Sequence, residues 1–402
     1  MTIEGGLVVL TALAVGALLT HVVAERSRAK AVVWVSFWLH VLVSFVLYDA
    51  QGLLADAGGY DTIAQAYVAF WNHQTASQPG FAVGKEGWVL ILAVIYYVLG
   101  HSPLVGLVLN ASACAITTSL VMGATARLGR PGIAKVAGWL SLLPTFLYWG
   151  SLLLRESLAW MLTAAMLWAA LGIAAKVGRA NVMVLLGAFA GMLWIRGTVA
   201  VVLVVGMALG IIASTRRIPP LLFAGAVGFA VVGGPLAVRV FTLVGGFSIE
   251  SLNASRASLS TAGSGFETTS YSDPVTLVQS LPRTFPRSLF GPYPWELTSL
   301  PITAVVDVVF WLFVLVLAWR GFRGIWRVRS VCVIPALCLL VTLGATSGSY
   351  GTLVRLRVQA AVLLLPLAAV GWRRVTRDQV ADGSAKGGGG EQVPIRASQP
   401  TP

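Results

Sequence analysis

The sequence predicts an all-α, polytopic membrane protein, and three observations support this fold class. Apolar residues make up 57% of the 402 residues, charged residues only 11%, and the mean hydropathy is +0.83. Soluble domains carry about a quarter charged residues. The apolar residues also fall in long runs, and about 20 such residues are enough to span a bilayer. These features exclude a soluble enzyme, a secreted disulfide scaffold and a disordered chain.

Eleven or twelve membrane-spanning helices are expected, in one transmembrane domain over residues 1–372. The window at 88–99 is short, so we expect a re-entrant or broken helix there. Pro144 and Gly150 are expected to loosen the helix that holds them. The other windows fall at about 6–24, 31–48, 104–126, 133–150, 156–175, 181–195, 197–214, 219–243, 303–320, 331–346 and 353–371.

Lysine and arginine cluster between these windows in a pattern that predicts orientation. Six clusters hold 19 of the 28 basic residues but only four of the 15 acidic ones, so one side carries +15 and the other −2. The net charge of +13 is therefore a topology signal, and we expect no nucleic-acid partner. We expect an integral plasma (inner) membrane protein with these clusters in the cytoplasm. Residues 373–402 lack apolar periodicity and are expected to form a disordered cytoplasmic tail.

The first outer connection, at about 49–87, is acidic and then amphipathic. Asp56 and Asp61 precede apolar residues at helical spacing, namely Ile63, Tyr67, Phe70 and Trp71. This spacing predicts a helix that lies on the outer leaflet, with Asp61 at its N-terminal end. Asp61 either only caps that helix or has a catalytic role as well.

Arginines stand at the outer ends of three later helices. Arg155 precedes Glu156, Arg196 interrupts an apolar stretch, and Arg355 and Arg357 follow a Ser/Gly-rich turn. Charges at membrane depth are costly and usually functional. Alternatively, Arg155 and Glu156 pair within the bundle while Arg196 snorkels. Because Arg355 and Arg357 lie about 200° apart around a helix, only one of them is expected to face a shared site, and we favour Arg355.

The longest outer segment runs from about 244 to 302. Tyr293 and Trp295 either stack on a ligand or anchor this segment at the lipid headgroups. Arg239 and Asp307, near the outer ends of flanking helices, are expected to form a buried pair with no catalytic role. Five prolines are expected to hold the second half of the segment extended: Pro282, Pro286, Pro292, Pro294 and Pro301.

Four short motifs, in this order and all on the outer side, resemble the GT-C superfamily of integral-membrane glycosyltransferases. That superfamily includes protein O-mannosyltransferases and glycosyltransferase-39-like proteins. The motifs are the acidic first loop with Asp61 and Tyr67, the P-x(11)-R-E block from Pro144 to Glu156, the GPYPW block, and a closing G-T-x-x-R-x-R. The resemblance covers about residues 45–372.

The resemblance implies transfer of a sugar from a polyprenyl-phosphate donor to a glycan, lipid or protein acceptor at the extracytoplasmic face. In that family an outer-loop aspartate is the catalytic base or helps to hold a divalent cation. Asp61 matches it best, with Asp56 as a substitute. Any metal would therefore be expected at these two residues.

The chemistry of this transfer suggests a role for each candidate. A carboxylate can take the proton of the acceptor hydroxyl, and arginine suits the leaving phosphate because its fork is bidentate and always charged. We assign two catalytic residues, Asp61 as the base and Glu156 as an orienting partner. The predicted substrate-binding set is Asp56, Tyr67, Arg155, Arg196, Tyr293, Trp295, Arg355 and Arg357, of which Arg155, Arg196 and Arg355 bind phosphate.

Two other functions remain open. A polymerase of lipid-linked oligosaccharides, as in O-antigen assembly, would also use outer arginines and one large outer loop, but would not require Asp61. A transporter or lipid flippase would place its charges near mid-membrane on broken helices, often with repeat symmetry between halves. The sequence shows no such repeat, so this function ranks third.

Overall fold

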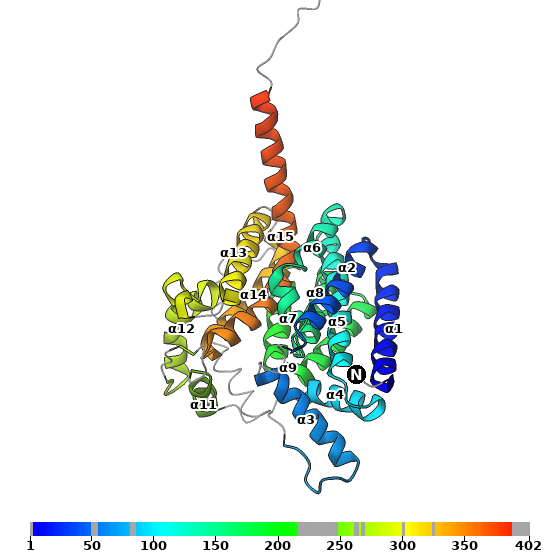
Figure 1. Cartoon of the computed structure of the whole chain (residues 1–402). Coiled ribbons are helices and arrows are strands. Elements are labelled where there is room, and N and C mark those ends of the chain that lie inside the picture. The colour runs from blue at the N-terminus through cyan, green and yellow to red at the C-terminus, as the bar shows by residue number, and fades with distance from the viewer. Residues whose placement is uncertain are drawn as a thin grey trace, which may run out of the picture.

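The computed structural model of the chain describes residues 3–49, 55–80, 86–215, 248–260, 265–266, 270–299, 302–323 and 326–387. Over these ranges every regular element is a helix, and the one β-bridge, between Gly265 and Ser349, is isolated. The helices pack side by side into a bundle (Figure 1). The predicted all-α membrane helix bundle is therefore confirmed.

Seven of the described helices are long and apolar enough to cross a membrane, which makes the chain a multi-pass membrane protein. Two shorter apolar helices, α2 (Lys30–Val46) and α4 (Glu86–Leu99), accompany them. The predicted span at 219–243 lies outside the described residues. The seven are α1 (Ile3–Arg26), α5 (Pro103–Arg127), α8 (Glu156–Ala175), α9 (Arg179–Thr215), α13 (Ile302–Phe322), α14 (Trp326–Thr346) and α15 (Tyr350–Gly387).

The window predicted at 133–150 forms two short helices, α6 (Ala134–Leu140) and α7 (Pro144–Gly150), after a 3-10 turn at Pro131–Ile133. Pro144 is the first residue of α7, where a missing N–H costs nothing because that group has no partner within the helix. The sequence predicted a helix loosened by Pro144, and the structure has a full break there instead of one continuous helix.

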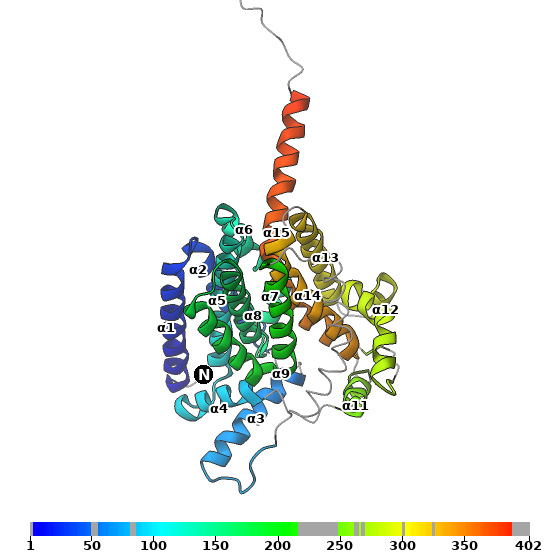
Figure 2. The same cartoon turned by 180° about the vertical axis from the view of Figure 1, so that it is seen from behind.

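Helix α9 is broken at Arg196, whose backbone is non-helical (φ −153°, ψ 79°). An unbroken helix of its 37 residues would be about 55 Å long, whereas the hydrocarbon core of a bilayer is about 30 Å thick. The break divides α9 into two arms. Near the start of the first arm, Asn181 lies beside Gly172, close to the end of α8. Near the end of the second arm, Gly210 lies against Val331, close to the start of α14. The arms therefore run in opposite directions and meet at Arg196, as the two adjacent windows predicted (Figure 2).

Helices α3 (Ala55–Trp71) and α4 lie together at the end of the bundle where α1, α5, α8, α13 and α15 begin (Figure 1). We call this the α3 end, and the opposite end, where α15 leaves the bundle, the tail end. Gly87 in the first turn of α4 contacts Trp194, near the break in α9. His101, just after α4, contacts Asp61 of α3. Both ends of α4 therefore lie at the α3 end, so it does not cross the bundle.

Helix α3 differs from its prediction in where it begins. It starts at Ala55, so Asp61 lies within the helix, and the prediction that Asp61 stands at its N-terminal end is wrong. Asp56 and Asp61 point about 140° apart around the helix and so face different neighbours. The buried positions recur at helical spacing: Ala57, Tyr60, Ala64 and Tyr67.

The segment at about 244–302, whose second half was predicted to be extended, contains helices α11 (Ile249–Ser260) and α12 (Pro274–Phe290) and a 3-10 turn at Pro294–Ser299. Pro282 and Pro286 lie inside α12, so that part of the prediction is wrong. Asp273 caps the N-terminus of α12 and stabilises the helix, because its carboxylate accepts hydrogen bonds from the backbone N–H groups of Val275 (2.7 Å) and Thr276 (2.9 Å). The two prolines are four residues apart and therefore weaken only one face.

Helix α15 continues past the expected domain boundary at 372 and projects from the bundle to Gly387 (Figure 1). The prediction of disorder from Arg373 onward therefore differs from the structure over 373–387. A helix that already exists can be extended without the cost of nucleation. The composition of residues 373–387 does not reveal that a helix precedes them. Residues 388–402 lie outside the described residues.

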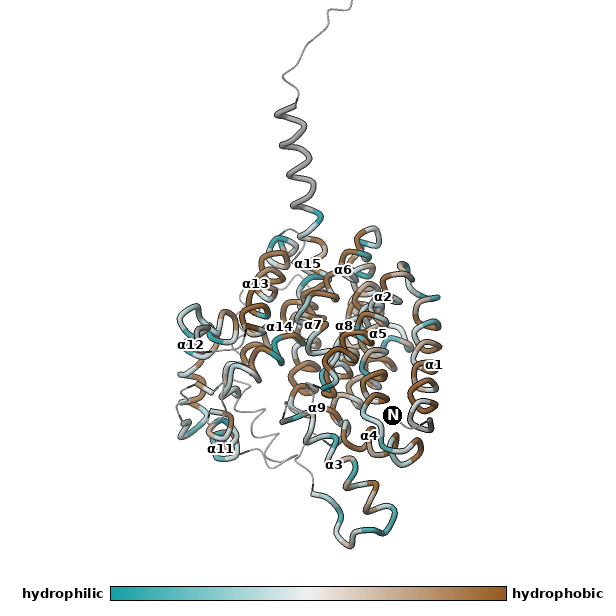
Figure 3. The backbone as a smooth tube through the Cα atoms, viewed as in Figure 1, coloured by the Kyte–Doolittle hydropathy of each residue, from teal (hydrophilic) through white to brown (hydrophobic). Residues whose placement is uncertain are grey.

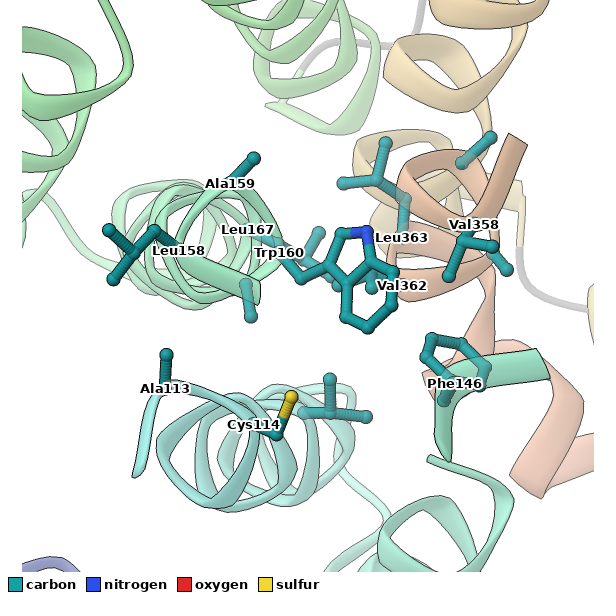
Figure 4. Close-up of a cluster of buried hydrophobic side chains, with 14 of the residues drawn as sticks. Ala113, Cys114, Phe146, Leu158, Ala159, Trp160, Leu167, Val358, Val362 and Leu363 are labelled. Carbon is teal, nitrogen blue, oxygen red and sulfur yellow. The ribbon is translucent and has the colours of Figure 1, made fainter. Parts of the chain in front are cut away.

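Hydrophobic residues predominate along the helices of the bundle, as the brown colouring shows (Figure 3). Trp160 of α8 packs edge to face on Phe146 of α7, with ring centroids 5.5 Å apart. Leu363 of α15 and Cys114 of α5 lie near the Trp160 ring (Figure 4). Cys114 and Cys332 are buried and free, as expected for small core residues.

Candidate functional site

Five charged side chains from four separate stretches of sequence meet at the α3 end. Glu156 Oε1 accepts a hydrogen bond from Arg196 Nη2 and lies 3.0 Å from Arg355 Nε. Arg355 Nη1 in turn donates to Asp56 Oδ2 at 2.5 Å. Arg155 Nη1 donates at 3.1 Å to the backbone carbonyl that precedes Arg196. We call these five residues the arginine cluster.

The arginine cluster is deeply buried on one side and open on the other. Glu156 and Arg196 are 1% and 4% exposed, whereas the Asp56 side chain is 38% exposed. Three guanidinium groups against two carboxylates leave a formal charge of +1. Arg196 Nε and Glu156 Oε2 have no hydrogen-bond partner among the described residues. A buried donor without a partner is costly, so the excess positive charge and Arg196 Nε suit the cluster to an anion that brings hydrogen-bonding oxygens, whereas Glu156 Oε2 requires a donor.

A buried non-helical stretch from 151 to 154 sets the position of Arg155 and Glu156. Its carbonyls need partners in the apolar interior. Asn110, fully buried in α5, donates to the carbonyls of Leu152 (2.7 Å) and Leu154 (2.9 Å). Sequence reasoning missed Asn110, although an amide in the middle of a predicted span is a signal of this kind.

Two residues one helical turn from predicted site residues complete the cluster. Tyr60 follows Asp56 by four positions and is 4% exposed. Burial raises the pKa of the Tyr60 hydroxyl, whereas the charge of Arg155 opposes that shift. Gln359 follows Arg355 by four positions and accepts a hydrogen bond from Arg196 at 3.4 Å.

Asp61 lies in a second cluster rather than among the arginines. Its carboxylate accepts hydrogen bonds from Gln65 Nε2 (2.8 Å) and Tyr96 Oη (2.7 Å), and lies 3.0 Å from His101 Nε2. Burial and the bond to Asp61 raise the pKa of the Tyr96 hydroxyl, which therefore stays protonated as a donor. We call these four residues the Asp61 cluster. Among the described residues Asp61 forms no ion pair with an arginine.

The predicted aromatic ligands lie outside both clusters. Tyr67 is 1% exposed and its hydroxyl donates to the carbonyl of Pro79 at 2.6 Å, so it packs α3 onto the following loop. Tyr293 and Trp295 stack on each other with centroids 4.9 Å apart, and Trp295 is 73% exposed. Sequence reasoning missed His101 and Tyr96, which stand near the end of a short apolar run.

Arg357 belongs to a third group, on the opposite side of α15 from Arg355. Its guanidinium donates to the carbonyl of Gly291 and lies 5.5 Å from the Trp311 ring centroid. Asp307, buried nearby, accepts hydrogen bonds from Thr145 and from Trp149 (2.8 Å). The cavity between them is about 10 Å³, the size of a single water. Arg239, the expected partner of Asp307, lies outside the described residues.

A divalent cation shared by Asp56 and Asp61 does not fit these residues as the structure places them. Asp56 is held by Arg355, and Asp61 is held by three hydrogen-bond donors on another face of α3. Over the described part of the chain, no three His, Cys, Asp or Glu side chains come close enough to hold a metal ion.

Comparisons with protein families, with curated proteins and with solved structures find no match for this chain. Its function is therefore inferred from the geometry of the two clusters and from the sequence motifs.

Proposed function

We propose that the chain is an integral-membrane glycosyltransferase that transfers a sugar from a polyprenyl-phosphate donor to an acceptor at the extracytoplasmic face. The observation that carries the proposal is the buried arginine cluster with its formal charge of +1. A polyprenyl-phospho-sugar is a phosphodiester with one negative charge, which would neutralise the cluster. Transfer leaves a phosphate monoester with about −1.5 to −2 charge, and fixed guanidinium groups stabilise that developing charge.

The distribution of basic residues supports placing the α3 end outside the cell. Arg127, Arg179, Arg320 and Arg373 stand at the tail end, where α5, α13 and the membrane-spanning part of α15 end and α9 begins. Lysine and arginine favour the cytoplasmic side of spanning helices. The arginine cluster would then face the leaflet in which exported lipid-linked sugars reside.

The two clusters divide the chemistry between them. Arg155, Arg196 and Arg355 bind the donor phosphate, and Glu156 orients the last two of these arginines. The Asp61 cluster activates the acceptor hydroxyl. Asp56 and Asp61 lie five positions apart on α3, so this one helix contributes a residue to each cluster.

In the experiment that tests this proposal, the purified protein is incubated with undecaprenyl phosphate carrying glucose, mannose, galactose or arabinose. Octyl glycosides are the acceptors, and mass spectrometry detects transfer of the sugar. Wild type is expected to transfer one of these sugars. Arg196→Lys is expected to lose about 10²–10³-fold, the usual cost of removing one fixed donor to a developing charge. Arg283→Gln, at an exposed arginine of α12, is the matched control.

If the protein neither transfers nor releases a sugar from any of these donors, the proposal is contradicted. Polymerisation of lipid-linked oligosaccharides is the second candidate, because the same arginines would bind its diphosphate. It would be favoured if Asp61→Asn kept full activity while Arg196→Lys lost it.

A further inference from the structure

A groove between α3 and α4 opens beside the Asp61 cluster. Its volume is about 380 Å³, within the range of pockets that bind small molecules. Polar groups and an aromatic ring share its wall, a combination suited to the hydroxyls and the apolar face of a sugar. The lining residues are Gln65, Ala66, Val68, Ala69, Gln74, Tyr96 and His101.

His101 stands at this groove because of how α4 ends. Gly100 has a left-handed backbone (φ +84°) and its N–H bonds to the carbonyl of Tyr96 at 2.9 Å, which closes the helix. The next residue, His101, then turns back onto α3. Its ring packs edge to face on Tyr96, with centroids 4.9 Å apart, and its side chain is 46% exposed.

The two ring nitrogens of His101 have different surroundings. Nε2 lies 3.0 Å and 3.2 Å from the two oxygens of Asp61. When Nε2 carries the proton and donates it to this carboxylate, Nδ1 holds the free lone pair. Asp61 also accepts from Gln65 and Tyr96, so three donors hold its orientation. Asp61 and Tyr96 are the titratable groups that the structure places against His101.

We infer that His101 is the base that deprotonates a sugar hydroxyl of the acceptor bound in this groove, with Asp61 as its positioning residue. This inference rests on the proposed function and names the group that receives the proton. The acceptor oxygen bonds to the anomeric carbon, and the bond from that carbon to the phosphate oxygen breaks. The bonding pair leaves with the phosphate, and the acceptor proton moves to His101 Nδ1 and then to water.

The first test is rescue by free imidazole in the turnover assay. His101→Ala should lose about 10²–10⁴-fold in transfer, the usual contribution of a general base, and added imidazole should restore much of that loss because the position is open to solvent. Asp61→Asn should also lose activity without being rescued. His21→Ala, at an exposed histidine of α1, is the control.

The second test requires no turnover. Diethyl pyrocarbonate should modify the exposed His73 and His101 in the wild-type protein, and octyl glycosides should protect His101. Protection without turnover of any donor would contradict the proposed function and keep the groove as a sugar site. Turnover with an unchanged rate for His101→Ala, or a loss that imidazole does not reverse, would overturn His101 as base. An absence of protection would overturn the acceptor site.

Discussion

Two groups of buried charge lie on opposite sides of the same helix. Arg355 and Arg357 are two residues apart on α15, yet Arg355 joins a cluster with two other arginines and two acids, whereas Arg357 lies beside Asp307. The arginine cluster has a formal charge of +1 and opens at Asp56. The group around Arg357 and Asp307 is neutral, and its cavity holds at most one water.

The difference shows how structural charges can be told from binding charges. Thr145 and Trp149 bind the two oxygens of Asp307, and Arg357 donates to a backbone carbonyl with the opposite charge of Asp307 beside it, although Arg357 Nε has no hydrogen-bond partner among the described residues. In the arginine cluster one carboxylate oxygen of Glu156 and one nitrogen of Arg196 lack partners among the described residues. The excess positive charge, which the group around Arg357 lacks, is what points to an anionic ligand in the arginine cluster.

The largest effect is expected for Glu156→Gln. The change leaves Arg196 and Arg355 buried without their shared counter-charge, and breaking a buried ion pair costs about 3–5 kcal/mol. Thermal unfolding in nanodiscs should show this loss, and turnover should vanish. Glu250→Gln, at an exposed acid of α11, should change neither. An unchanged unfolding temperature for Glu156→Gln would show that the cluster is not held by this carboxylate.

The next effect separates Arg355 from Arg357. Arg355→Lys should reduce donor turnover by about 10²–10³-fold, because lysine cannot present a bidentate fork to phosphate. Arg357→Lys should lower stability, since it loses the contact with Gly291 and the packing on Trp311, and should leave the KM for the donor unchanged. Equal loss of turnover in both variants would remove the distinction between the two groups.

A smaller effect is expected for Asn110→Ala. It leaves the carbonyls of Leu152 and Leu154 without their donor in the interior, at about 1–3 kcal/mol for a buried group left unsatisfied. Turnover should fall as well, because this stretch positions Arg155 and Glu156. Thr117→Val is the matched control, since Thr117 is also buried in α5 but bonds only within its own helix. Similar losses in both variants would argue against a role for Asn110 in positioning the cluster.

The helix bundle and the three arginines of the cluster followed from the sequence for different reasons. Runs of apolar residues are local signals, so the apolar helices could be predicted, and a proline is a local signal too, so a disturbance at Pro144 could be predicted. Arg155, Arg196 and Arg355 were recognised because a charge at the end of an apolar run is rare. The structure brings Arg196 and Arg355 onto Glu156 and places Arg155 on the carbonyl before Arg196.

The remaining site residues could not be placed by position in the chain alone. Asp61 was ranked above Asp56, but helix α3 starts earlier than expected, so the face toward the arginines carries Asp56. Tyr60 and Gln359 each lie four residues after a charged residue of the cluster, and the i, i+4 rule could have found them. His101 owes its place to a turn that closes α4, which no apolar pattern specifies.

The smallest effect is expected for Trp295→Ala. Trp295 is 73% exposed and contacts Tyr293, and changes at such exposed sites usually stay within about 0.5 kcal/mol. Stability should therefore be unchanged, and so should turnover if the aromatic pair only anchors its loop. A selective rise in the KM for the donor would instead assign Trp295 to the binding site and enlarge the arginine cluster toward this loop.

The measurement that tests the central claim most directly is the binding of undecaprenyl phosphate to the purified protein, detected by native mass spectrometry. Wild type and Arg357→Lys are expected to retain the lipid, whereas Arg196→Lys and Arg355→Lys should lose it. Retention that is equal in all four proteins would show that the arginine cluster does not bind the phosphate.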